Sequence, residues 1–309
     1  MRKPPATAFL SGAAALAAYL FAAGPAAAPP VAVLIERRAS PYQQAAVGFR
    51  QGFGSPERAE LIQLGGEARE RDERLAALRQ SRPRLIVAIG TPVARAAREQ
   101  LPGVPILYCL ALDPQRNQLV GPNIGGVSMD VPVAEQIHRI HQALPKVAAI
   151  GVIYNQPTSG ALVREAQKHL QRGVTLVARD AATPQRAAQL VDELVGRVDA
   201  FWLLLDGVIA NPANFPRLVE ACFRNRVALI APGSAFVEAG ALLSIGPDYL
   251  KVGQRVGAMA QQVLEGRARP EDFGAEPPRD ATLTINSQVA RRLGLTFPPD
   301  LRADYLSLP

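Results

Sequence analysis

The polar residues best suited to ligand chemistry in this 309-residue chain follow short apolar runs. Thr91 and Pro92 come directly after one run. A threonine cap followed by proline at the first helical position presents a hydroxyl and free backbone N–H groups, which suit a carboxylate. Asp206 ends another run, and its carboxylate suits an ammonium group or ligand hydroxyls. Thr91 also fits a plain helix cap, and Asp206 also fits a turn or capping aspartate.

Four more residues are candidates for the same kind of site. Asn155 ends an apolar run and carries the same ambiguity as Asp206. Tyr42 and Tyr154 could stack on an aromatic or apolar ligand, although core packing suits at least one of them better. Asp248 lies where the chain is expected to cross between two lobes, so it could hold a hinge instead of a ligand.

Several catalytic and metal-binding patterns are missing from the sequence. No GxxxxGK[ST] phosphate loop occurs, and neither Ser128 nor Ser234 lies in GxSxG. His138 and His141 are three residues apart on the helix expected near Pro132–Leu144, but no cysteine or carboxylate completes a metal site at helical spacing. The sequence therefore predicts a protein that is not an enzyme and that holds neither a metal ion nor a cofactor.

The basic charges are scattered over the chain. The formal net charge is +7, from 34 basic and 27 acidic residues. The densest stretch, 67–84, contains Glu70 and Arg74 at the i,i+4 spacing of a salt-bridged surface helix. This arrangement argues against a nucleic-acid partner.

The first 28 residues have the pattern of a secretory signal. Arg2 and Lys3 precede the apolar run Ala13–Ala23, and small residues follow up to Ala28. The pattern predicts cleavage near residues 24–28 and a soluble, exported, periplasmic protein. An uncleaved N-terminal anchor helix is the alternative.

Export makes a disulfide between the two cysteines chemically possible. Both residues, however, lie in apolar surroundings: Cys109 in the run 106–110, and Cys222 on a helical stripe with Phe215 and Leu218. We therefore expect both thiols to be free and buried.

From residue 31 onward, short β-branched runs alternate with helical patterns, which predicts parallel sheets covered on both faces. The first set of runs is Val31–Ile35, Leu61–Leu64, Leu85–Ile89 and Ile106–Leu110, and the second is Ala148–Tyr154, Thr175–Ala178, Phe201–Leu205 and Ala228–Ala231. Two four-strand sets predict an α/β fold of two Rossmann-like lobes joined by hinge crossings. We expect lobe one to comprise 29–124 plus 246–276, and lobe two 125–245 plus 277–309.

The stretch between the two sets is expected to hold turns and a crossing. It contains Gly121-Pro122-Asn123 and Gly125-Gly126, which are typical turn sequences. In open parallel sheets, strand carboxyl ends and helix amino ends meet at one crevice. Two lobes that face each other would therefore form a cleft able to close on a small ligand.

Short motifs in a shared order resemble one known family over nearly the whole mature chain. They include Ile86-Val-Ala-Ile-Gly-Thr-Pro92, Asn123-Ile-Gly-Gly-Val-Ser128, Val131-Pro132 with Gln136, Ile150-Gly-Val-Ile-Tyr-Asn155, Asp199-Ala200 leading to Asp206, and Gly246-Pro-Asp-Tyr249. The chain looks like the ABC-type substrate-binding proteins whose characterised members include tryptophan and phenylalanine binders.

The resemblance implies a type I periplasmic-binding-protein fold with three crossings. It implies a monomer that delivers a small solute, such as an amino acid or another small carboxylate, to a membrane permease driven by a separate ATPase. By analogy, Thr91 would hold a ligand carboxylate, Asp206 an amino group, and Asn155 and Asp248 would lie near the cleft. Where the family often has a His-Pro pair after the first strand, this chain reads Glu36-Arg37-Arg38-Ala39-Ser40-Pro41-Tyr42, and Arg37 and Arg38 near the strand end could favour a more anionic ligand.

Two other functions remain open at this point. A sensory module that reports to a membrane sensor kinase would use the same cleft. A two-lobe nucleotide-sugar enzyme would need a phosphate loop and a base in the cleft, and export would be unusual for it.

Overall fold

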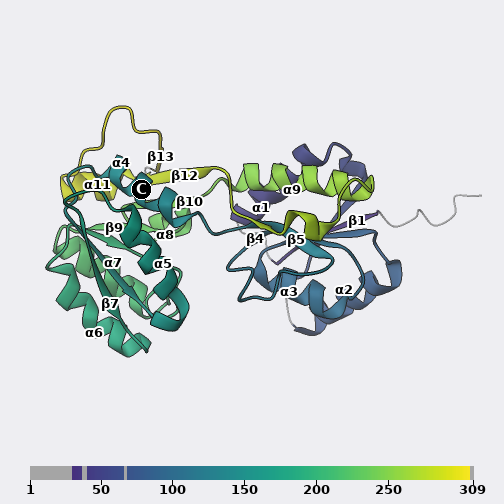
Figure 1. The fold of residues 1–309 in the computed structure, drawn as a ribbon, viewed down its shortest axis with the longest axis horizontal. Coiled ribbons are helices and arrows are strands. Elements are labelled where there is room, and N and C mark those ends of the chain that lie inside the picture. The colour runs from purple at the N-terminus through teal and green to yellow at the C-terminus, as the bar shows by residue number, and fades with distance from the viewer. Residues whose placement is uncertain (1–29, 37–39, 66–67, 307–309) are drawn as a thin grey trace, which may run out of the picture.

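The computed structural model describes residues 30–36, 40–65 and 68–306. It shows two α/β lobes side by side, connected by segments that run between them (Figure 1). The expected signal peptide, Arg37 and Arg38 lie outside the described residues. Within the described part of the chain, no helix combines the length and the apolar character that crossing a membrane requires.

Lobe one is built on a six-stranded parallel sheet with the order β11-β5-β4-β3-β1-β2. Its strands are β1 (Val31–Ile35), β2 (Ala59–Gln63), β3 (Leu85–Ile89), β4 (Ile106–Ala111), β5 (Ile124–Ser128) and β11 (Ala275–Glu276). Its helices are α1 (Ser40–Phe53), the short 3₁₀ helix η1 (Pro56–Arg58), α2 (Ala68–Ser81), α3 (Thr91–Gln100), α9 (Tyr249–Leu264) and α10 (Pro270–Phe273).

Lobe two contains a seven-stranded sheet with the order β13-β12-β10-β9-β8-β6-β7, in which β12 runs antiparallel to β10. Its strands are β6 (Ala149–Tyr154), β7 (Thr175–Asp180), β8 (Ala200–Trp202), β9 (Ala228–Ala231), β10 (Leu243–Pro247), β12 (Ala281–Asn286) and β13 (Asp304–Leu306). Its helices are α4 (Val133–Ala143), α5 (Gln156–His169), α6 (Pro184–Val195), α7 (Asn214–Arg224), α8 (Ser234–Glu238) and α11 (Ser287–Leu293).

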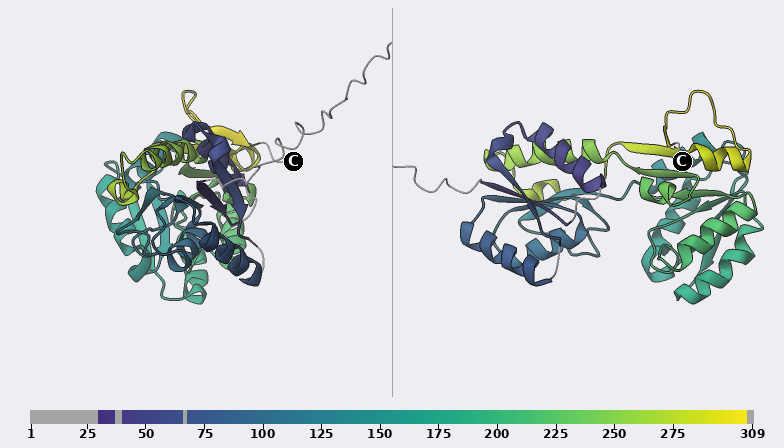
Figure 2. Two further views of the ribbon diagram at one scale, coloured as in Figure 1. Left: turned by 90° about the vertical axis from the view of Figure 1, so that its right-hand side faces the viewer. Right: turned by 180° about the vertical axis from the view of Figure 1, so that it is seen from behind.

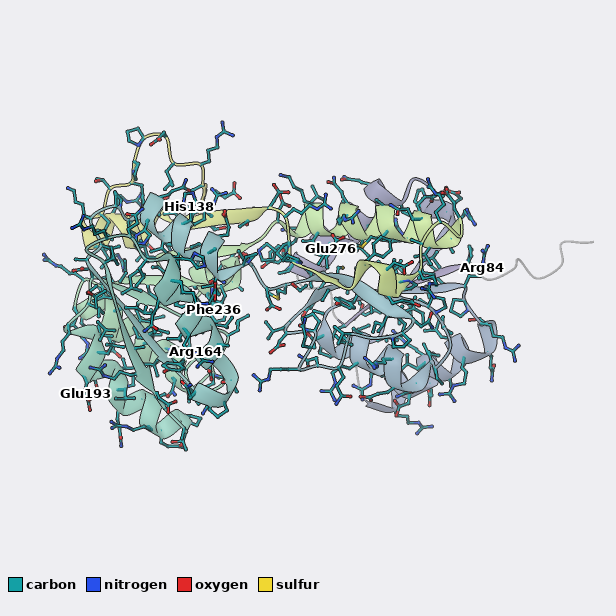
Figure 3. All side chains as sticks on the ribbon, in the orientation of Figure 1. Arg84, His138, Arg164, Glu193, Phe236 and Glu276 are labelled. Carbon is teal, nitrogen blue, oxygen red and sulfur yellow. The ribbon has the colours of Figure 1, made fainter. Side chains whose placement is uncertain are left out.

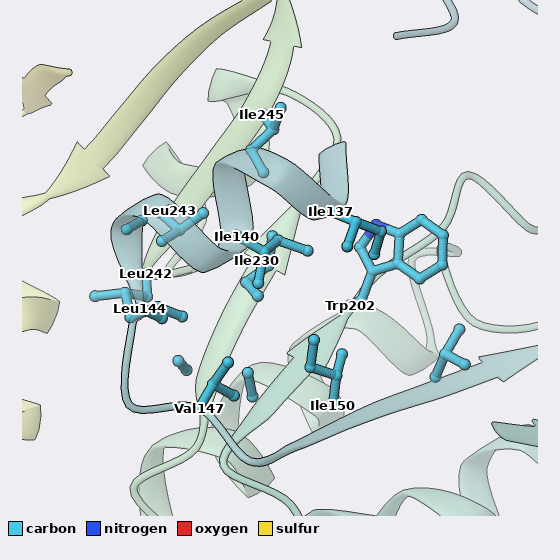
Figure 4. Close-up of a cluster of buried hydrophobic side chains, with 14 of the residues drawn as sticks. Ile137, Ile140, Leu144, Val147, Ile150, Trp202, Ile230, Leu242, Leu243 and Ile245 are labelled. Carbon is cyan, nitrogen blue, oxygen red and sulfur yellow. The ribbon is translucent and has the colours of Figure 1, made fainter. Parts of the chain in front are cut away.

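Both sheets are covered on two faces, as the continuous apolar strands predict. In β3, Val87 packs with α1 and α9, whereas its neighbours Ile86 and Ala88 pack with α3. In lobe two, α4 and α5 cover one face around Trp202 (Figure 4), and α6 and α7 cover the other. The predicted α/β class with two Rossmann-like lobes is confirmed.

The two lobes repeat one strand order. If the first five strands of each lobe are numbered 1 to 5 along the chain, both sheets have the spatial order 2-1-3-4-5. This order is β2-β1-β3-β4-β5 in lobe one and β7-β6-β8-β9-β10 in lobe two. In such sheets the order reverses between the first and third strands, and ligands bind beyond the carboxyl ends of the strands at that point. The residues after β3 and β8 are therefore placed at ligand-binding positions of the fold.

Helices α1 and α9 pack closely through glycines. A Cβ atom on Gly48 would lie 2.0 Å from Leu250 O, and one on Gly253 would lie 2.1 Å from Ala45 O. Gly52 and Gly257 make similarly close approaches to the opposite backbone. Because α9 begins immediately after a crossing, this contact fixes one end of the hinge to the body of lobe one.

Strand β5 corrects the expectation that residues 121–126 form only turns and a crossing. Gly125 and Gly126 lie inside β5, which pairs with β4 and β11. A Cβ on Gly126, where φ is +152°, would lie 2.0 Å from Tyr108 O. Glycine is present here because the neighbouring backbone leaves no space for a side chain. In the sequence, such a strand glycine looks the same as a turn glycine.

Three segments cross between the lobes: 129–132 after β5, Asp248 after β10, and 277–280 before β12 (Figure 2). The expected boundary after residue 124 falls inside β5, and the one after residue 245 falls inside β10. We propose that the lobes meet at these three crossings instead. The crossings at Asp248 and 277–280 are linked, because Asp248 N donates to Asp280 O at 3.1 Å.

The third crossing is also tied to α9 by an ion pair. Arg255 donates from Nε to Glu276 Oε2 at 3.0 Å and from Nη2 to Oε1 at 2.5 Å. The guanidinium also lies 5.8 Å from the ring centre of Phe273. Figure 3 labels Glu276 beside α9 in lobe one.

The expected ion pair on α2 and the expected free cysteines are present. Arg74 pairs with Glu70 at 2.5 Å. At the start of α6, Thr183 caps the helix by accepting from Arg186 N. Cys109 and Cys222 are free and buried, and they lie in the cores of different lobes. On α5, Leu162 is 43% exposed and lines the cleft described below.

Candidate ligand-binding site

A cavity of about 770 Å³ opens where the two lobes meet the first crossing. This volume is within the usual range for small-molecule sites, about 300–1,000 Å³. Lobe one contributes Leu112, Asp113, Arg116 and Asn117; the crossing contributes Met129, Asp130 and Val131; and lobe two contributes Gln136, Pro157, Thr158, Ser159, Ala161, Leu162, Leu203, Leu204, Leu205, Asp206, Gly207, Pro232 and Ile245. The lining is mainly aliphatic with a few charged groups.

Asp206 organises the lobe-two wall. It is 3% exposed and follows β8. Its Oδ2 accepts hydrogen bonds from Asn155 N at 2.8 Å, Thr158 Oγ1 at 2.7 Å and Ser159 Oγ at 2.7 Å. Its Oδ1 accepts from Val208 N at 3.1 Å. The carboxylate thus holds the first turn of α5 against the end of β8.

These hydrogen bonds decide the charge state of Asp206. Burial disfavours its ionised form, but the four donors outweigh burial and hold the pKa below its usual range. A carboxylate offers about four lone-pair sites, two on each oxygen, and the three donors on Oδ2 with the one on Oδ1 use most of this capacity within the protein. Asp206 is therefore an ionised positioning group in this structure.

The lobe-one wall is the loop that follows β4. Leu112 N donates to Thr91 Oγ1 at 2.9 Å, which ties this loop to the start of α3. Asp113 Oδ1 accepts from Arg116 N at 3.1 Å, and the Arg116 side chain lies 3.7 Å from Asp113 Oδ2. Arg116 Nη1 also donates to Thr158 O at 3.3 Å. A guanidinium on lobe one thus reaches across the cavity to α5 on lobe two.

The crossing forms the base of the cavity. Asp130 Oδ2 accepts from Asp113 N at 2.8 Å, and Asp130 N donates to Ser128 Oγ at 3.3 Å. Gln136 Nε2 donates to Val131 O at 2.8 Å, while its Oε1 accepts from Trp202 Nε1 at 3.0 Å. These bonds hold the crossing against both lobes.

Comparison with known proteins places this geometry in a family. A family model described as ABC transporter substrate binding protein matches residues 65–304, which is more than half of the chain. The chain belongs to this family. This confirms the resemblance noted from the sequence motifs.

Two curated relatives are similar to this substrate-binding protein. The Tyrosine-binding protein of Clostridioides difficile (strain R20291) is 29% identical over 193 residues, which are 60% of this chain and 55% of that protein. The Uncharacterized protein RP367 of Rickettsia prowazekii (strain Madrid E) is 25% identical over 206 residues, 65% of this chain and 64% of that protein. The chain thus spans less than two thirds of the length of either relative.

Two solved structures share the fold over most of their length. The ligand-free, open structure of CD0873, a substrate binding protein with adhesive properties from Clostridium difficile, has a TM-score of 0.76 at 23% identity and covers 90% of this chain and 99% of its own. The ABC domain in complex with L-Trp from Streptococcus pneumonia has a TM-score of 0.64 at 25% identity and covers 87% and 95%.

Of the six site residues expected from the sequence, Asp206 lines the cavity of this substrate-binding protein. Asn155 lies just behind the wall: its Nδ2 donates to Ala181 O at 3.3 Å, and its Oδ1 accepts from Thr158 Oγ1 at 3.3 Å. Thr91 does not line the cavity, but its Oγ1 accepts a hydrogen bond from the N–H of Leu112, which does line it. The expectation that Thr91 caps its helix is wrong, because Gly90, with φ of +106°, occupies the N-cap and Thr91 is the first helical residue.

The other three expected residues lie outside the cavity lining. Tyr42 packs against the lobe-one core beside Gly90, where an added Cβ atom would lie 3.2 Å from Tyr42 Cε1. Tyr154 packs against the lobe-two core. Asp248 caps α9 by accepting from Lys251 N at 3.0 Å, so it lies at the second crossing as its hinge alternative suggested.

Arg116 and Asp130 were not expected as site residues from the sequence. Both lie in irregular segments, where neither apolar periodicity nor a strand end marks a position. His138 is exposed on lobe two (Figure 3), and His141 is buried and accepts from Gln171 N at 3.4 Å. Burial and the nearby His138 lower the pKa of His141. Among the described residues, no group of three or more His, Cys, Asp or Glu is arranged to hold a metal ion.

Proposed function

We propose that this protein is an exported solute receptor that binds one amino acid between its lobes and presents it to an ABC-type importer. The observation that carries the proposal is the cavity of about 770 Å³, whose walls come from both lobes and from the crossing between them. A ligand that contacts both walls stabilises the closed arrangement over the open one, so binding and lobe closure are coupled.

The lining supports an amino acid with an apolar or aromatic side chain. Aliphatic groups such as Leu112, Leu162, Leu205 and Ile245 surround the space, and Arg116 offers a guanidinium for a carboxylate. The names of two similar proteins, a tyrosine-binding protein and a domain in complex with L-Trp, agree with this class. Thr91 then acts indirectly, by holding the Leu112 wall, and Asn155 and Asp206 act by positioning α5.

The partners follow from the family. A membrane permease with a separate ATPase subunit would receive the ligand, and the receptor would act as a monomer without a catalytic step. Membership of the family and the secretory pattern of residues 1–28 support an extracytoplasmic, periplasmic location.

The proposal is tested by ligand binding to the purified protein. We expect L-tyrosine, L-tryptophan or L-phenylalanine to raise the unfolding temperature and to bind with 1:1 stoichiometry in calorimetry. A ligand at about 100 times its dissociation constant adds roughly 2.7 kcal/mol of stability, which thermal shift detects. Binding of sugars or inorganic anions alone, or of none of these compounds, would refute an amino-acid receptor.

The role of Arg116 gives a sharper form of this test. Arg116→Ala should weaken binding of the best amino acid roughly tenfold to a hundredfold, because it removes a charge-assisted hydrogen bond to the ligand carboxylate. Arg98→Ala is the matched control: its guanidinium is also on lobe one and also donates to a carbonyl, Val120 O at 3.1 Å, but it does not line the cavity. Equal losses in the two variants would contradict the assignment.

A further inference from the structure

Three carboxylates line the cavity, and they differ in how far their oxygens are already used. Asp206 accepts four hydrogen bonds, three on Oδ2 and one on Oδ1, which leave it little acceptor capacity. Asp113 is occupied by the backbone and side chain of Arg116. Asp130 accepts one hydrogen bond, on Oδ2 from Asp113 N, and among the described residues no cation lies within ion-pair distance of it. Asp130 therefore has acceptor capacity left for a ligand.

We propose that Asp130, rather than Asp206, receives the ammonium group of the ligand and makes the cleft selective for compounds that carry an amine. This inference rests on the proposed function and assigns the polar subsite within it. An ammonium group is held best by a carboxylate with free lone pairs at a partly desolvated position, and Asp130 is half-buried with free lone pairs.

The neighbours of Asp130 suit a zwitterion. Asp113 links Asp130 to Arg116: its N–H donates to Asp130, and its carboxylate pairs with the Arg116 guanidinium. An acceptor for an ammonium group and a donor for a carboxylate thus lie on one continuous segment of the cavity wall. Asp130 is also on the first crossing, so a ligand bound there contacts the segment about which the lobes move.

Ligand binding should consequently depend on pH. Burial raises the pKa of Asp130 to about 6; the Asp113 N–H opposes this rise and the Asp113 charge adds to it. The other ionisable groups near this position are Tyr108, whose buried hydroxyl has no hydrogen-bond partner among the described residues, and Arg116 and Asp206, which line the same cavity. Below about pH 6 the protonated carboxyl no longer attracts an ammonium group, so affinity should fall as the pH drops.

The test uses L-tyrosine with two analogues, tyramine, which lacks the carboxylate, and 3-(4-hydroxyphenyl)propionate, which lacks the amine. Asp130→Asn should weaken L-tyrosine and tyramine roughly tenfold to a hundredfold at about pH 7.5 and change binding of the amine-free acid less than about threefold. It should also flatten the pH dependence between about pH 5 and pH 7.5. Asp113→Asn, which changes a carboxylate in the same cavity, should keep the preference for L-tyrosine over its amine-free analogue.

Folding does not confound this comparison. Because folding raises the pKa of Asp130, ionisation of this residue opposes folding above about pH 6, and asparagine removes that opposition. The asparagine side chain also keeps an oxygen for the Asp113 N–H. The unfolding temperature of Asp130→Asn at about pH 7.5 should therefore equal or exceed that of the native protein.

The outcomes separate the two proposals. If the native protein binds L-tyrosine, L-tryptophan or L-phenylalanine but Asp130→Asn keeps full affinity and the full preference for the amine, Asp130 is not the subsite and the amino-acid receptor stands. The same conclusion follows if Asp113→Asn, and not Asp130→Asn, removes that preference. If the native protein binds none of these amino acids, the proposed function fails and the subsite assignment fails with it.

Discussion

Asp206 shows how one buried carboxylate fixes the shape of a cavity wall. It joins the end of β8 to the first turn of α5 through four hydrogen bonds, and those bonds hold its pKa below the usual range. Two of its donors, Thr158 and Ser159, line the cavity. The position of this wall therefore depends on the charge of Asp206.

We predict that Asp206→Asn lowers the free energy of unfolding at about pH 7 by roughly 2–3 kcal/mol, because charge-assisted hydrogen bonds are replaced by weaker or missing ones. Urea denaturation measures the change. A group with a lowered folded pKa stabilises the native state above its unfolded pKa, near 4, and this contribution is lost as the pH falls further. The difference between native protein and variant should therefore shrink between about pH 5 and pH 3.

Asp180→Asn is the matched control for this substitution. Asp180 also accepts at the start of α5, from Gln156 N at 2.8 Å, but it is exposed and the structure shows this single acceptor contact for its side chain among the described residues. The Asp180→Asn substitution should lower the free energy of unfolding by about 1 kcal/mol or less. A larger effect for Asp180 than for Asp206 would contradict the role given to Asp206.

At the residue scale, the sequence pointed to the correct edges of the sheets, but Asp206 is the single expected site residue among those described that lines the cavity. Asp206 was found because parallel strands deliver their last residues to a common edge. Arg116 and Asp130 were missed because their positions depend on how the loop after β4 folds against the crossing, and no local pattern encodes that contact. The two tyrosines expected to stack on a ligand lie in or beside the cores instead.

At the element scale, the contact between α1 and α9 carries the clearest structural requirement. Gly253 faces the backbone of α1, with Ala45 O only 2.1 Å from the place of a Cβ atom. The obstructing atom is backbone, so a side chain can be accommodated only by moving the helices apart. Such a movement would also displace the second crossing, because α9 starts at Tyr249, directly after Asp248.

We predict that Gly253→Ala destabilises the protein by roughly 3 kcal/mol, at the upper end of the usual cost of overpacking. Thermal or chemical unfolding measures it. Gly196→Ala is the control, since Gly196 has φ of −72° and nothing within 4 Å of its Cβ position, and it should change stability by about 0.5 kcal/mol or less. A neutral Gly253→Ala would show that the two helices are not packed as closely as described.

The alternation of apolar runs with helical patterns predicted most elements of both lobes. It failed for β5, where glycines that allow close backbone approach were interpreted as turns, and it overextended β8, which ends at Trp202 although the apolar run continues to Leu205. In both places the side-chain pattern is determined by tertiary packing rather than by local structure. Periodicity therefore locates buried segments more reliably than it locates strand ends.

At the scale of the whole molecule, the proposed capture of a ligand requires the two lobes to move about the three crossings. Arg116 and Thr158 already make one contact across the cavity, from lobe one to lobe two. A ligand that binds both walls would add contacts that exist only in the closed arrangement, so it should shift the population towards closure. The substitutions of Asp206 and Gly253 test the stability of the fold around the cavity, whereas a distance across the cleft tests whether the lobes close on a ligand.

The most direct measurement is the distance across the cleft. Double electron–electron resonance measures it between spin labels at Gln115→Cys on lobe one and Arg164→Cys on lobe two. The native cysteines do not interfere, because burial raises the pKa of Cys109 and of Cys222 to about 12 and shields both thiols. A second pair, at Arg164→Cys and Glu193→Cys, lies within lobe two, where Figure 3 shows Arg164 nearer to lobe one than Glu193.

Adding the amino acid that binds best should shorten the distance between the labels at 115 and 164 and leave the distance within lobe two unchanged. If that amino acid binds tightly while both distances stay constant, the cleft does not close on its ligand, and the central claim is contradicted.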